Sequence, residues 1–173
     1  MSRQGAVTFK GNPMTLAGSE VKAGDQAPDF TLHCFADGGL KAIKPADLKG
    51  KPTILSVVPS LDTPVCQVQT KRFNQDLGAL GDKINAVTVS LDLPFAMNRF
   101  CGAENITNLQ NGSDYQDRSF GQNWGTLIEE LKIHARAVFV LDADGQVTYA
   151  QVVKEVAEEP DYDAALAALK QLL

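Results

Sequence analysis

The chain has 173 residues, of which 44% are hydrophobic and 21% charged, the composition of an ordinary globular protein with one domain and a substantial core. Its net charge is −5 and its lysines and arginines form no cluster, so we expect no nucleic-acid partner. No apolar run is long enough for a signal peptide or a membrane-spanning helix, and the 3 cysteines are too few for a secreted disulfide scaffold, which predicts a cytoplasmic protein with no membrane partner.

Strands and turns are predicted for the first part of the chain. Weak alternation in residues 6–10 and 14–17 around Gly11-Asn12-Pro13 predicts a short N-terminal hairpin. The pattern then predicts a strand over 30–34, a strand over 40–43, a helical turn over 45–48 and a buried strand over 53–58. Cys34 falls at the end of the first of these strands, where we expect a small buried side chain.

A helix follows the buried strand, and its start places a cysteine in an unusual environment. Apolar residues at positions 65, 68, 73, 77 and 80 predict a helix that ends at Gly81, with Thr63 as its N-cap and Pro64 in its first position. Cys66 then lies in the first turn, near unpaired backbone N–H groups and the positive end of the helix dipole. This environment favours the nucleophilic thiolate, but a structural cysteine behind an ordinary helix cap fits the same pattern.

The rest of the chain alternates strands with helices. The pattern predicts a strand over 84–91, a short helix from Pro94 that contains Cys101, an irregular polar segment over 104–116, a short helix over 118–124 and a loop or turn over 127–133. It ends with a strand over 137–141, a turn at 142–145, a strand over 147–153 and a helix from Pro160. This order predicts an α/β fold in which a mixed sheet lies between layers of helices.

Arg136 stands at the start of an apolar strand, which is an unusual place for a charge. A buried arginine needs an anionic partner, and a Cys66 thiolate would be one. An arginine that reaches solvent from the end of the strand fits the same sequence.

Thr63 and Cys66, together with a proline just before them, belong to a known motif. Pro59, Thr63 and Cys66 match the Pro-x-x-x-Thr/Ser-x-x-Cys motif of the peroxiredoxins. Together, segments along most of the chain resemble the thiol peroxidase branch of that family, the Tpx-type atypical two-cysteine peroxiredoxins: residues 9–13, 59–66, 92–96, 99–104, 135–138 and 159–162. The resemblance implies one thioredoxin-like domain over residues 1–173, in which helices flank a mixed central β-sheet and a β-hairpin is added at the N-terminus.

The resemblance also implies an activity. It is that of a thiol-dependent peroxidase in antioxidant defence, which reduces hydrogen peroxide and alkyl hydroperoxides without a metal or an organic cofactor. A bacterial source, a homodimer, and thioredoxin as the reductant are implied as well.

The resemblance assigns roles to individual residues. Cys66 would be the peroxidatic cysteine and become a sulfenic acid, and Cys101 would resolve it as an intramolecular Cys66–Cys101 disulfide that thioredoxin reduces. The hydroxyl of Thr63 would orient the sulfur or the peroxide, Arg136 would pair with the thiolate, and Pro59 would shield the site. Both cysteines lie near helix ends, so we expect local unwinding before the bond forms, aided by the polar segment after Cys101.

Three other interpretations stay open at this point. The same first step could use glutaredoxin or a low-molecular-weight thiol as reductant. The chain could be a non-catalytic redox sensor that passes its oxidation to a partner. It could also be a cysteine hydrolase, which would depend on His134, two residues from Arg136.

Overall fold

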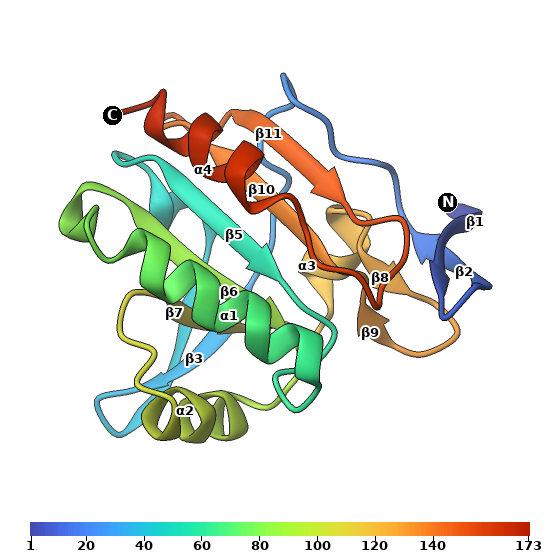
Figure 1. Ribbon diagram of the computed structural model, residues 1–173, viewed down its shortest axis with the longest axis horizontal. Helices are drawn as coiled ribbons and strands as arrows, with labels where there is room; N and C mark the ends of the chain where they lie inside the picture. Colours follow the sequence, from blue (N-terminus) through green and yellow to red (C-terminus); the bar gives the residue numbers. More distant parts are fainter.

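The structure, a computed structural model that describes residues 1–173, is built on a seven-stranded mixed sheet (Figure 1). In spatial order its strands are β11 (Val147–Val152), β10 (Ala137–Leu141), β5 (Thr53–Val57), β6 (Asn85–Ser90), β7 (Gln110–Ser113), β3 (Leu32–Ala36) and β4 (Gly39–Ile43). Strand β6 pairs in parallel with β5 and β7, and every other neighbouring pair is antiparallel. The predicted mixed sheet is therefore confirmed.

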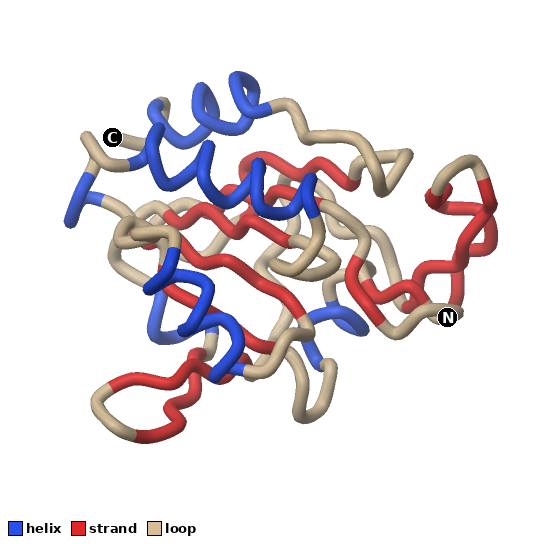
Figure 2. Tube along the Cα trace, turned by 60° about the horizontal axis from the view of Figure 1, so that its bottom comes forward, coloured by secondary structure: helices blue, strands red, loops and turns tan.

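Helices cover both faces of this sheet. Helices α1 (Pro64–Leu77) and α4 (Tyr162–Lys170) lie side by side on one face, as Figures 1 and 2 show, and their apolar side chains share one buried cluster. Helix α2 (Pro94–Ala103) lies near α1, over β7 and β3, and the short helix α3 (Ser119–Asn123) covers the opposite face. Single 3₁₀ turns occur at Pro45–Leu48 and Gly81–Lys83. None of the helices combines the length and the apolar character needed to cross a membrane.

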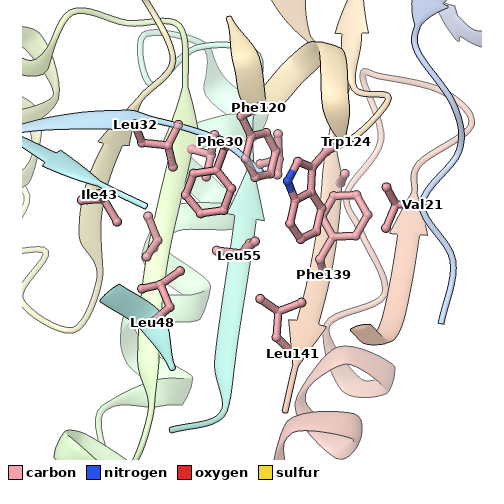
Figure 3. Packing of buried hydrophobic residues seen from close by; sticks show 14 of the residues in the cluster. Val21, Phe30, Leu32, Ile43, Leu48, Leu55, Phe120, Trp124, Phe139 and Leu141 are labelled. Atoms are coloured by element: carbon pink, nitrogen blue, oxygen red, sulfur yellow. The ribbon is translucent and has the colours of Figure 1, made fainter. Parts of the chain in front are cut away.

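The central strands are buried because both faces of the sheet are covered, and most of their side chains are apolar. Every residue of β5 and β10 is buried. Ile54 and Val138 face α1 and α4, whereas Leu55 and Phe139 face the opposite cluster. In that cluster the rings of Phe120 and Trp124 stack with centroids 4.9 Å apart, and Phe30 and Phe139 pack around them (Figure 3). This packing holds β5 and β10 in place, and the candidate active site lies at the ends of these two strands.

The N-terminal hairpin is confirmed and is longer than the sequence predicts. Strands β1 (Ser2–Phe9) and β2 (Asn12–Ala17) form a second sheet with β8 (Leu127–Ile128) and β9 (Ile133–His134), in the order β1-β2-β8-β9. The backbone of Thr8 also exchanges hydrogen bonds with Lys154 and Val156, at 2.7 and 2.8 Å. These contacts hold the tip of the hairpin against the segment that follows β11.

The first long helix differs from its prediction in length and in the face that it buries. It ends at Leu77 rather than at Gly81, because the chain tightens into shorter turns in which the N–H of Leu80 donates to the carbonyl of Leu77. Val68 is 49% exposed, whereas Gln69 is fully buried, so the prediction of a wholly apolar buried stripe is wrong at these two positions. A hydrogen bond explains why the polar Gln69 is buried, since its amide donates to Ser56 Oγ at 2.8 Å.

Two segments expected to be irregular contain strands. The polar stretch 104–116 includes β7, which gains its partners only when β6 and β3 lie on either side of it. Its Gly112 has a packing reason, because a Cβ atom there would lie 2.8 Å from Leu32 Cδ1. The stretch 127–133 includes β8 and reaches β9, which pair with each other and extend the sheet of the hairpin. The other predicted strands and helices are present, with ends shifted by a few residues.

Candidate active site

Cys66 lies at the junction between the central strand β5 and helix α1. It is the third residue of the helix and is fully buried, in a small cluster with Val58, Leu61 and Met97. The first intrahelical hydrogen bond is donated by Gln67, so the N–H groups before it have no partner within the helix. The sulfur therefore sits at the positive end of a helix, which attracts negative charge.

Thr63 occupies the N-cap position, but its side chain does not cap the helix. The backbone is extended there and the hydroxyl makes no capping hydrogen bond. Its Oγ1 lies 2.7 Å from Cys66 Sγ and 2.9 Å from the carbonyl oxygen of Ser60. One hydroxyl has a single proton to donate, so it can donate to a Cys66 thiolate, or accept from the thiol while it donates to Ser60.

Arg136 is buried beside the sulfur. It is 2% exposed, and its Nη1 lies 3.5 Å from Cys66 Sγ. The guanidinium is held by Nε donation to the carbonyl of Val156 at 3.0 Å and by Nη1 donation to Gln69 Oε1 at 3.1 Å. The ion pairs of the chain include no carboxylate with this guanidinium, so a thiolate at Cys66 would be its only close anion.

A largely apolar cavity of about 260 Å³ opens beside these groups. Thr63, Pro59 and Arg136 are among the residues that line it. Phe9 and Lys10, from the tip of the N-terminal hairpin, line it as well. On the same measure a water molecule needs about 10–15 Å³, so the cavity has room for a small organic molecule next to the reactive groups.

Cys101 lies on α2, away from the cluster around Cys66. It is half-buried against the side chains under α1 and α4, and its thiol donates to Asn111 Oδ1 at 3.1 Å. Burial raises the pKa of this thiol, which keeps it protonated in this structure. All 3 cysteines are free, so the structure is that of the reduced protein.

The other candidate residues lie elsewhere. Cys34 is 6% exposed and packs in the core cluster, as the sequence predicts for a small buried side chain. His134 is fully buried, with Nδ1 2.9 Å from Thr126 Oγ1 and Nε2 3.3 Å from Asp114 Oδ2. No hydrogen bond joins His134 to Cys66, so the hydrolase interpretation is wrong, because its base points into a different part of the core. The structure also contains no group of 3 or more side chains suited to hold a metal ion.

Two residues near the site are not identified by the sequence analysis. Gln69 orients Arg136, yet a glutamine one turn after the cysteine is an ordinary helix residue in sequence. Asp92 accepts hydrogen bonds from the loop that precedes Cys66. Its only sequence signal is a position directly after a buried strand, where polar side chains often serve a site.

Comparison with known proteins places this geometry in a family. The Redoxin family profile matches residues 22–166. The thiol peroxidase of Bacillus subtilis (strain 168) is 50% identical over 167 residues, which cover 96% of this chain and 98% of that protein. The thiol peroxidase of Staphylococcus aureus (strain COL) is 48% identical over 166 residues, with coverage of 96% and 98%.

Solved structures agree with the fold. A peroxiredoxin-like protein from Aquifex aeolicus is 39% identical, with a TM-score of 0.87 and coverage of 99% of both chains. A thiol peroxidase from Chromobacterium violaceum shares the fold at 18% identity, with a TM-score of 0.82 and coverage of 95% of both chains. The predicted thioredoxin-like fold is thus confirmed, and the chain belongs to the Redoxin family, in its thiol peroxidase branch.

Proposed function

We propose that the protein is a thiol-dependent peroxidase with Cys66 as its peroxidatic residue. The observation that carries the proposal is the buried Cys66 sulfur, with the Thr63 hydroxyl at 2.7 Å and the Arg136 guanidinium at 3.5 Å. The thiolate attacks the terminal oxygen of a hydroperoxide, the O–O bond breaks, and the products are Cys66 sulfenic acid and, after protonation, an alcohol or water. Two of its relatives, from Bacillus subtilis and Staphylococcus aureus, are thiol peroxidases, which supports the same activity.

Thr63, Arg136 and Pro59 have separate roles in this proposal. The two donors stabilise the thiolate and then the charge that develops on the leaving oxygen, in a site with little water to screen them. Pro59 is buried and lines the cavity, where it has no reactive atom and excludes water from the sulfur. The size and apolar lining of the cavity support organic hydroperoxides as substrates in addition to hydrogen peroxide.

We propose that Cys101 then attacks the sulfenic acid and forms the Cys66–Cys101 disulfide with loss of water. Thioredoxin returns both thiols by thiol–disulfide exchange. The two thiols lie in different buried clusters, and a disulfide requires Cα atoms about 4.4–6.8 Å apart, so both helices must open locally.

The polar segment after Cys101 does not aid this opening, contrary to the expectation from the sequence. The segment after Cys101 is not loose, because the backbone N–H groups of Thr107 and Asn108 donate to Asn74 Oδ1 at 3.0 and 2.9 Å, and β7 follows. The opening is better placed in the first turn of α1 and in α2 itself.

Three broader features complete the proposal. The whole chain, residues 1–173, forms one domain, which is supported by the hydrogen bonds between the N-terminal hairpin and the segment after β11. A homodimer is supported by Leu93 and Phe95, which are 51% and 53% exposed at the start of α2. The cytoplasm is the proposed location, since the cycle depends on a thiol reductant.

Peptide mapping by mass spectrometry tests the proposed function. The reduced protein is treated with a stoichiometric amount of hydroperoxide, without reductant. A Cys66–Cys101 bridge within one chain is the expected product, and turnover driven by thioredoxin is the next assay. If Cys66 stays unreacted, the peroxidase proposal fails; if Cys66 is oxidised and Cys101 stays free, only the resolving role fails.

Thr63→Val is expected to slow the oxidation of Cys66 by about a hundredfold, as for the loss of one donor in a preorganised site. Valine keeps the shape of threonine but removes the hydroxyl that lies 2.7 Å from the sulfur. Thr63→Ser keeps the hydroxyl and is expected to react at nearly the normal rate. Stopped-flow measurement of Cys66 oxidation checks both variants, and equal slowing in both would contradict the role of the hydroxyl.

Arg136→Lys is expected to lower the same rate by about tenfold to a hundredfold, because lysine keeps the charge but cannot reproduce the planar fork. A single ammonium cannot reach Val156, Gln69 and the sulfur in the geometry that the guanidinium achieves. Arg99→Lys, on the exposed side of α2, is the matched control and should leave the rate unchanged.

A further inference from the structure

The carboxylate of Asp92 ties the loop that leads into Cys66 to the end of strand β6. Oδ1 accepts a hydrogen bond from Ser60 Oγ at 2.8 Å. Oδ2 accepts from the backbone N–H of Leu61 at 2.8 Å and from Ser90 Oγ at 2.9 Å. Ser60 and Leu61 belong to the loop that leads into Cys66, and Ser90 ends the strand β6 next to it. A single side chain thus fixes this loop with charge-assisted hydrogen bonds.

Leu61 connects the Asp92 carboxylate to the reactive sulfur. Its side chain is 2% exposed and lies in the same buried cluster as Cys66 and Met97. While the N–H of Leu61 is bound to Asp92, the backbone that carries this side chain is held in place. Because the Leu61 side chain packs in the cluster that encloses the sulfur, departure of the sulfur toward Cys101 requires this packing to come apart.

The backbone of Asp92 is also held by hydrogen bonds. The N–H of Asp92 donates to Ser90 Oγ at 3.1 Å, and the carbonyl of Asp92 accepts from the hydroxyl of Ser113 in β7. Asp92 stands two residues before α2, the helix that carries Cys101. The carboxylate therefore bridges the approach to one cysteine helix and the approach to the other.

We propose that Asp92 is a positioning residue that holds the closed, peroxide-reactive form and sets how readily the protein opens to join Cys66 and Cys101. This inference rests on the proposed function. Loss of the carboxylate frees Ser60 and Leu61, so the equilibrium moves from the closed form to the open one.

The Cys66 sulfenic acid reacts differently in the open and the closed form, so its products measure the equilibrium between them. In the open form the Cys101 thiol attacks it, which forms the S–S bond and releases water. In the closed form a second hydroperoxide oxidises it to a sulfinic acid and leaves as an alcohol. The ratio of disulfide to sulfinic acid therefore measures opening, and a general loss of stability far from the site does not change it.

Asp92→Asn is the test variant, because it keeps the shape of the side chain but removes the charge and one acceptor oxygen. Treated with excess cumene hydroperoxide, the variant is expected to show about tenfold less sulfinic acid relative to disulfide, as for the loss of a hydrogen bond to a charged group. Cys66 is also expected to react more slowly in the first step, since the closed form is less populated. Ser60→Ala removes only one of the three bonds and is expected to change the ratio in the same direction by less.

Asp142→Asn is the matched control. Its Oδ1 accepts the N–H groups of Asp144 and Gln146, at 2.9 Å each, in the turn between β10 and β11. The control loses comparable hydrogen bonds but should keep the wild-type ratio. The inference is overturned if Asp92→Asn also keeps that ratio, whatever its melting temperature. If Asp92→Asn fails to fold, an unchanged ratio in Ser60→Ala overturns it instead. Failure of the proposed function is distinct, because Cys66 of the wild type would then not be oxidised at all.

Discussion

Cys66→Ser is expected to reduce peroxide turnover by at least about 10⁴-fold, the scale of effect seen when a nucleophile is removed. Serine fits the space of the cysteine, and its hydroxyl can still meet Thr63 and Arg136. A hydroxyl oxygen is neither ionised at neutral pH nor able to form a sulfenic acid, so the first step has no nucleophile. A thioredoxin-coupled assay with an organic hydroperoxide measures the loss.

Cys34→Ser is the control for this change, because it replaces another buried cysteine with the same residue. The Cys34 side chain packs in the core cluster and lies outside the cavity next to Cys66. We expect a small loss of stability from the buried hydroxyl and unchanged turnover per folded molecule. Full activity in Cys66→Ser, with loss of activity in Cys34→Ser, would show that Cys34 and not Cys66 is the nucleophile.

Cys101→Ser is expected to abolish turnover with thioredoxin while the first oxidation of Cys66 proceeds at the normal rate. The burial that raises the pKa of the Cys101 thiol keeps it protonated in the closed form, and exposure to water on opening lowers the pKa again. Opening thus brings the sulfurs together and also makes the Cys101 thiol easier to ionise. In the variant the sulfenic acid has no resolving partner, so single-turnover mass spectrometry should find Cys66 as sulfenic or sulfinic acid.

The same variant separates the remaining alternatives. Turnover that persists in Cys101→Ser would indicate glutaredoxin or a low-molecular-weight thiol as the reductant. A wild-type protein that is oxidised once, is not turned over by thioredoxin and forms a mixed disulfide with a client would indicate a redox sensor.

The junction at Cys66 could be predicted because its signals are local. A buried strand, a threonine, a proline and a cysteine follow one another within 14 residues, from Thr53 to Cys66, and each keeps its preferred backbone position in the structure. The N-cap hydroxyl is the exception: the position is right, but the hydroxyl bonds to the Cys66 sulfur and the Ser60 carbonyl and does not cap the N–H groups of the helix. Local preference fixes the backbone there, and the chemistry of the neighbouring sulfur decides the hydrogen bond.

The features that the sequence could not predict depend on distant partners. Strand β7 is poor in strand-forming residues and exists because β6 and β3 supply its hydrogen bonds. Gln69 is buried because Arg136 and Ser56 satisfy it, and neither is near it in the chain. The roles assigned to Pro59 and Cys101 came from a family resemblance. Arg136 stood out as a charge at the start of an apolar strand, but the sequence left open whether it pairs with Cys66 or reaches solvent.

The cation beside Cys66 lies 70 residues further along the chain, and the carbonyl that orients the cation follows another 20 residues later. During synthesis the cysteine emerges first, so the unfinished chain carries a thiol without its guanidinium neighbour. The same holds whenever the finished protein unfolds, because the cation and the sulfur separate. Reactivity toward peroxide is thus a property of the completed fold, and a nascent or unfolded chain carries no thiol activated for oxidation.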